Sequence, residues 1–144
     1  MPSPVIIWMS PSRPIKEELE LARREIGDYP VRFIRLASPE VDPMKIVRTV
    51  YPIARTREVW LVLTAAPSVI EGVLMLLAEH GLDKKVHVVV PVIQILARVP
   101  ENMAYAYRRP GVGTICYRGE CIVYHPLELR LVSGVTLYTK PLPA

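Results

Sequence analysis

Hydroxyl side chains follow two of the apolar runs in this sequence, at positions where they could bind an anionic ligand. Ser10 and Ser12 come after the first run, and Thr64 and Ser68 come after the third. In an open α/β sheet, ligands bind at the carboxyl ends of the strands, where the N–H groups of helix starts attract phosphate. Short hydroxyls add donors without bulk. These four residues therefore predict a site for a phosphate-bearing nucleotide.

Ser68 also has a structural explanation. The segment from Ser68 to Glu71 has the spacing of a capping box, in which the serine accepts from the N–H of the glutamate and the glutamate reaches back. The turn also has Ala65, Ala66 and Pro67 where a phosphate-gripping loop would have glycines. The cap is the simpler role for Ser68, whereas a structural role explains Thr64 and Ser10 less well.

A second group of residues could bind nucleic acid directly. Tyr105 and Tyr107 stand beside Arg108 and Arg109, and this combination can stack bases and hold phosphates. The formal charge of +4 attracts polyanions only mildly. The alternative is a loop with solvated arginines. Direct RNA or DNA binding is therefore the second functional hypothesis, and a structural or assembly role without a small ligand is the third.

The two cysteines flank a turn signal. If Arg118 and Gly119 form a two-residue turn, Tyr117 faces Glu120, and Cys116 faces Cys121 in the next cross-strand pair, within disulfide range. A disulfide and two reduced, packed thiols are both compatible with this spacing. The spacing is not that of a redox or zinc motif.

No residue is assigned a catalytic, metal-binding or cofactor-binding role. His80, His87 and His125 lack metal-ligand spacing, so we expect structural roles for them. The acidic residues of the first predicted helix are expected to form a solvated face; they are Glu17, Glu18, Glu20 and Glu25.

Four apolar runs predict the strands that position these groups, at residues 5–9, 31–36, 59–63 and 86–90, and the first, third and fourth runs are nearly continuous. Helical patterns separate them. The first has Ile15, Leu19, Ala22 and Ile26 on one face; the second begins at Asp42 and Pro43 and ends at Pro52; the third spans about 69–80. The pattern predicts a three-layer α/β fold with a Rossmann-like, open parallel sheet.

The later part of the chain has hairpin signals. Arg118-Gly119 and Ser133-Gly134 each lie between alternating segments, whereas residues 92–99 fit a helix or a strand equally well. We expect one domain, in which an α/β core (1–91) and a connector (92–111) precede an antiparallel β-hairpin extension (112–144). The apolar content of 51% in so short a chain predicts a homodimer.

Composition also bears on the source and the compartment. One Gln and one Asn beside 15 Pro are typical of a hyperthermophile, archaeal-type protein. No apolar run is long enough to cross a bilayer, and the N-terminus lacks a basic leader. We therefore expect a cytoplasmic protein that does not contact membranes.

Residues 30–90 resemble the CRISPR-associated Rossmann-fold (CARF) domain family. The resemblance is carried by VRFIRLASPEVDPMKIVRTV and EVWLVLTAAPSVIEGVLMLLAEHGLDKKVHVVV, although Ala65 and Ala66 stand where the family usually has glycine. It implies a homodimer that binds cyclic oligoadenylates, with Thr64 and Ser68 in the polar turn and Ser10 and Ser12 in the first loop. Some members cleave that ligand without metal.

Overall fold

The computed structural model describes residues 3–132 and shows one six-stranded mixed sheet in the order β2-β1-β3-β4-β6-β5. The strands are β1 (Val5–Ser10), β2 (Val31–Arg35), β3 (Val59–Leu63), β4 (Val86–Pro100), β5 (Gly113–Tyr117) and β6 (Glu120–Leu131). β1 pairs in parallel with β2 and β3, and β3 pairs in parallel with β4. The four predicted parallel strands are confirmed.

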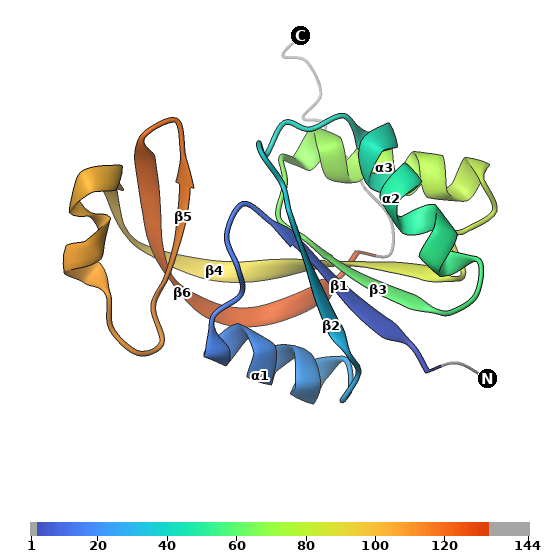
Figure 1. The fold of residues 1–144 in the computed structure, drawn as a ribbon, viewed down its shortest axis with the longest axis horizontal. Coiled ribbons are helices and arrows are strands. Elements are labelled where there is room, and N and C mark those ends of the chain that lie inside the picture. The colour runs from blue at the N-terminus through green and yellow to red at the C-terminus, as the bar shows by residue number, and fades with distance from the viewer. Residues whose placement is uncertain (1–2, 133–144) are drawn as a thin grey trace, which may run out of the picture.

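Helices cover both faces of the parallel part of the sheet (Figure 1). α1 (Lys16–Glu25) lies on one face, and α2 (Pro43–Ala54) and α3 (Pro67–Glu79) lie on the other. β1 is buried along its whole length: Val5, Ile7 and Met9 pack toward α2 and α3, and Ile6 and Trp8 pack toward α1. Burial on both faces explains its continuous apolar sequence.

The sheet is not an open parallel sheet throughout, because β4 continues far past its predicted end. Residues 92–99, which the pattern left between helix and strand, belong to β4, and β6 pairs with this strand in antiparallel orientation. β3 pairs with β4 only as far as Val89, so Pro91 lies where β4 has lost its neighbour on that side. A missing N–H is tolerated there. The antiparallel strands curl the sheet into a half-barrel (Figure 1).

β5 and β6 form the predicted hairpin. Arg118 and Gly119 have φ angles of 51° and 77°, as a two-residue turn of this hand requires. Cys116 faces Cys121 across the hairpin. A 3₁₀ helix, η1 (Glu101–Tyr107), connects β4 to β5. The predicted turn at Ser133-Gly134 lies outside the described residues.

Two helix predictions need correction. Asp42 caps α2 as expected, since its carboxylate accepts from the Met44 N–H at 3.0 Å, but the helix passes through Pro52 to Ala54. A proline one turn from the end of a helix removes a single backbone bond. Val50 and Ala54 on either side of it are fully buried in the core, and this packing holds the last turn in place.

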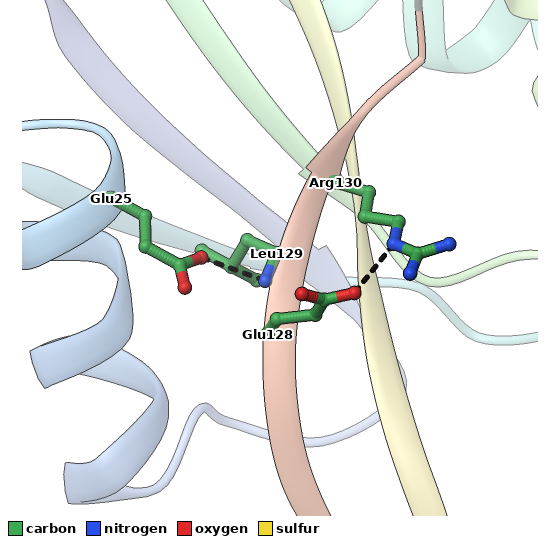
Figure 2. A network of polar contacts seen from close by, with 4 residues as sticks. All are labelled: Glu25, Glu128, Leu129 and Arg130. Carbon is green, nitrogen blue, oxygen red and sulfur yellow. Dashed lines mark hydrogen bonds and ion pairs between the residues drawn. The ribbon is translucent and has the colours of Figure 1, made fainter.

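α1 buries a face that differs in part from the predicted one, since Ala22 and Ile26 pack on the core as expected. Glu18, Leu21 and Ala22 are its buried residues, and Leu19 is exposed. The cause is a pair of carboxylates that bind β6, so the prediction of a wholly solvated acidic face is wrong. Glu25 accepts from the Leu129 N–H at 2.8 Å, in a part of β6 that β5 does not reach, and Glu128 pairs with Arg130 beside it (Figure 2).

The second carboxylate is that of Glu18, which is only 3% exposed. It accepts from the Tyr124 hydroxyl at 2.8 Å and from the Ile15 N–H at 3.0 Å. Burial raises the pKa of Glu18, against the effect of these two bonds. Burial and the adjacent carboxylate also raise the pKa of Tyr124. Glu18 therefore joins the start of α1 to the middle of β6.

Among the described residues, no helix is long and apolar enough to cross a membrane.

Candidate functional site

A cavity of about 370 Å³ lies where the carboxyl ends of β1 and β3 face the β5–β6 hairpin. Its volume is within the range of small-molecule sites. One side is made by the loops after the parallel strands, and the other by the far end of β4 and the hairpin. The lining residues are Pro11, Pro39, Thr64, Ala65, Ala66, Ile93, Arg98, Ile115, Tyr117, Glu120 and Ile122.

Backbone bonds between loops hold the strand-end side of the cavity. The Thr64 N–H donates to the Met9 carbonyl at 2.9 Å and continues the β1–β3 pairing by one residue. The Ala66 N–H donates to the Pro39 carbonyl at 2.9 Å and ties the start of α3 to the loop after β2. These bonds hold Thr64 at the carboxyl-terminal edge of the parallel strands.

The hairpin side follows from the alternation of side chains along a strand. Ile115 and Tyr117 of β5 face the cavity together with Glu120 and Ile122 of β6, whereas the intervening residues face away. Arg98 is the register partner of Ile122 and brings a guanidinium to the same surface. This side is therefore an isoleucine floor with polar groups at its rim.

Tyr117 connects the two sides. Its phenol oxygen accepts from the Ser38 hydroxyl at 3.2 Å, and the Ser38 oxygen itself accepts from the Glu40 N–H at 3.0 Å. The guanidinium of Arg118 lies 5.0 Å from the centre of the Tyr117 ring on the turn. The hairpin tip is thus bonded to the loop that follows β2.

Of the four hydroxyl residues expected to bind a ligand, Thr64 lines the cavity and the three serines do not. Ser10 is 3% exposed, and its oxygen accepts from the Ser12 N–H at 3.4 Å. Ser68 is exposed at the second position of α3. The structure therefore brings one member of the predicted set to the cavity.

The predicted Ser68 cap is wrong. The N-cap of α3 is Ala66, which makes no side-chain cap bond, and Pro67 occupies the first helical position. The predicted box is displaced because Pro67 is favoured at that position. The Ala66 carbonyl accepts from both Val69 and Ile70, and Pro67 has no N–H. The start of α3 consequently offers few free donors to an anion.

Arg98 and Glu120 are the charged residues of the cavity, and sequence reasoning assigned neither to a site. Both are exposed, and neither takes part in an ion pair within residues 3–132. A cavity with one free guanidinium and one free carboxylate can hold a ligand that carries both an anionic group and hydrogen-bond donors.

The alternative set, Tyr105, Tyr107, Arg108 and Arg109, lies on and after η1, outside the cavity lining. All four residues are exposed, and Tyr105 is 72% exposed. Ala104 of η1 packs against the small core cluster behind the hairpin, which consists of Val99, Cys121 and Val123. The structure thus presents these side chains to solvent on a supported turn.

The histidines make local contacts. Nδ1 of His80 is 2.8 Å from the Leu76 carbonyl, and Nδ1 of His125 is 2.8 Å from the Gly111 carbonyl. His87 pairs with Glu58 at 2.7 Å while its ring stacks on Trp60. Within the described part of the chain, no three His, Cys, Asp or Glu residues are grouped to hold a metal ion.

Comparisons with protein-family models, with curated proteins and with solved structures give no match to this chain. The cavity and its residues are therefore the basis of the functional argument.

Proposed function

We propose that the protein binds a phosphate-bearing nucleotide in the cavity between the strand ends and the β5–β6 hairpin. The observation that carries this proposal is the position of the cavity, since α/β sheets bind ligands at the carboxyl ends of their parallel strands. The helices on both faces of β2, β1, β3 and β4 support a Rossmann-like interpretation of this half of the fold.

The chemistry of the lining matches the two parts of a nucleotide. The floor of Ile93, Ile115 and Ile122 suits the face of a base, and the Tyr117 ring lies beside it. Arg98 supplies a fixed positive charge for a phosphate, and the Thr64 hydroxyl supplies a donor. A volume of about 370 Å³ accommodates one nucleotide unit.

The narrower form of the proposal is a CARF-like sensor of cyclic oligoadenylate. The resemblance of residues 30–90 supports it, as does the location of Thr64 at the cavity. In this form the protein is a cytoplasmic homodimer, and the two copies hold one cyclic ligand. The role that we propose for it is binding of this ligand.

Calorimetric titration with adenosine, ATP, linear oligoadenylates and cyclic tetra-adenylate tests the proposal. Thr64→Val keeps the shape of the side chain and deletes the hydroxyl, so affinity should fall by about 1–3 kcal/mol, as for a hydrogen bond to a charged group. Arg98→Gln should weaken phosphate-bearing ligands more than adenosine. Ser68→Ala is the matched control, because Ser68 is exposed and does not line the cavity. Unchanged affinity in both cavity variants, or no binding by wild type, refutes the proposal.

A second candidate is single-stranded RNA or DNA binding through η1. The observation that favours it is the exposure of Tyr105, at 72%, next to Arg108 and Arg109. The salt dependence separates the two candidates, because a surface that neutralises several phosphates loses affinity steeply with salt.

Light scattering tests the homodimer: a mass near 16.3 kDa at micromolar concentration contradicts it. If the protein is a dimer but binds none of these ligands, the result favours the third hypothesis, an assembly role.

A further inference from the structure

The cysteines and the cavity residues occupy opposite faces of the same hairpin tip. Cys116 and Cys121 form a disulfide between register partners, with their Cα atoms 4.0 Å apart. Cys121 is fully buried against Val99 and Val123, in the small core cluster behind the hairpin. The neighbours of the two cysteines line the cavity on the other face: Ile115, Tyr117, Glu120 and Ile122.

β5 is the element of this cavity with the least support. Within residues 3–132 it is the last strand of the sheet and pairs with β6 alone, over five residues. The Ser38–Tyr117 hydrogen bond is its contact with the opposite side of the cavity. The disulfide is therefore the covalent link that fixes Ile115 and Tyr117 relative to the rest of the lining.

The closed loop is short, with a sequence separation of 5, so the disulfide adds little to global stability by chain entropy. Its effect is local. In the oxidised protein, the side chains of β5 are held in place before a ligand arrives. In the reduced protein, a bound ligand must first order this edge strand, and ordering costs free energy that is subtracted from affinity.

We propose that the Cys116–Cys121 disulfide controls ligand affinity, which makes the cavity a redox-regulated site. This proposal rests on the function proposed above. The partner reaction is thiol–disulfide exchange with a dithiol reductant. A thiolate of the reductant attacks Sγ of Cys116, which is half-buried, whereas Cys121 is fully buried. The S–S bond breaks, and Cys121 leaves as a thiolate and takes up a proton.

The second thiol of the reductant then attacks the mixed disulfide. This step releases Cys116 as a thiol and the reductant as its own disulfide, so two electrons and two protons pass to the protein. The reduced β5 is held by its pairing with β6 and by the Tyr117 contact. Oxidation by a disulfide of the same class reverses each step.

The experiment compares oxidised and dithiothreitol-reduced protein by two measurements. Hydrogen exchange at the amides of Ile115 and Tyr117 should accelerate on reduction, while exchange in β1 stays unchanged. Affinity for ATP and cyclic tetra-adenylate should fall by about fivefold to a hundredfold, because two side chains must be ordered on binding. Cys116→Ser with Cys121→Ser should match the reduced protein and should not respond to dithiothreitol.

Different failures point to different steps. Unchanged exchange in β5 overturns the proposal, and so does faster exchange with unchanged affinity for a nucleotide that binds. If neither nucleotide binds in either redox state, the proposed function fails. In that case the exchange data still decide whether the disulfide holds the cavity wall.

Discussion

Tyr124→Phe removes one hydroxyl from a buried contact between distant parts of the chain. That hydroxyl donates to Glu18 at 2.8 Å, and both side chains are 3% exposed. The variant leaves the Glu18 carboxyl with the Ile15 N–H as its remaining donor, at 3.0 Å. Since phenylalanine fills nearly the same volume, the change in unfolding free energy reports on the hydrogen bond.

The size of the loss depends on the charge of Glu18. A hydrogen bond to a neutral group contributes about 1 kcal/mol, and one to a charged group about 1.5–3 kcal/mol. Burial raises the pKa of Glu18, so this carboxyl is neutral in the folded protein at pH 4. Burial also raises the pKa of Tyr124, so the phenol is still protonated at pH 9. We expect a loss of about 1 kcal/mol at pH 4 and about 1.5–3 kcal/mol at pH 9.

The wild-type protein should show a related pH dependence. Because the folded-state pKa of Glu18 is raised, the folded protein holds this proton more tightly than the unfolded chain. The contribution of Glu18 is therefore fully present below the unfolded pKa and is lost as pH rises through the folded pKa. The Tyr124 bond lowers the pKa of Glu18 against burial, so Tyr124→Phe should make this loss larger and extend it to higher pH.

Urea unfolding followed by circular dichroism at both pH values measures these quantities. Tyr105→Phe is the matched control, since Tyr105 is 72% exposed and should change stability by less than about 0.5 kcal/mol. A loss at pH 9 no larger than the loss at pH 4 refutes the reasoning about charge. A loss below about 0.5 kcal/mol at both values refutes the hydrogen bond itself.

Three further predictions concern one glycine and the starts of two helices. In Gly113→Ala the new Cβ meets the Tyr124 ring at 2.5 Å, so urea unfolding should show a loss of about 1–3 kcal/mol; wild-type stability would contradict this packing. Asp42→Ala should cost about 1 kcal/mol in thermal melts, because the carboxylate caps the Met44 N–H. Ser68→Ala should change stability by less than about 0.5 kcal/mol, since Ser68 caps nothing. A larger loss in Ser68→Ala than in Asp42→Ala would show that Ser68 caps α3 after all.

The parallel half of the fold could be predicted from sequence because its signals are local. Continuous apolar runs arise when both faces of a strand are buried, and β1 and β3 meet that condition. The hairpin turn at Arg118 and Gly119 could also be predicted. A two-residue turn of this type needs positive φ at both positions, and a glycine between two alternating segments indicates it. Each of these elements is determined mainly by its own residues.

The curled half could not be predicted in the same way. The second half of β4 has exposed apolar residues such as Ile95 and Leu96, and its identity as a strand depends on β6, more than 20 residues later. The face of the hairpin that meets the cavity depends on that pairing as well. Alternation puts Tyr117 and Glu120 on one face, but it does not show what that face meets.

The buried glutamate shows a similar limit. Glu18 has the sequence context of a surface helix, and its burial is explained by Tyr124, which is 106 residues away. Among the expected ligand residues, the position of Thr64 could be predicted because it directly follows a buried strand. The missing cap of Ser68 was harder to predict, because Pro67 moves the helix start by two positions, from the predicted cap at Ser68 to Ala66.

The contacts of α1 with β6 have a consequence for synthesis on the ribosome. The residues that α1 binds lie 106 and 104 positions further along the chain, so they are translated several seconds later at about 5–20 residues per second. α2, β3 and α3 can pack on β1 during that interval, but α1 has no β6 to bind. The two carboxylates of α1 therefore gain their partners last, and until then apolar contacts such as that of Ala22 with Ile6 and Trp8 hold the helix against β1.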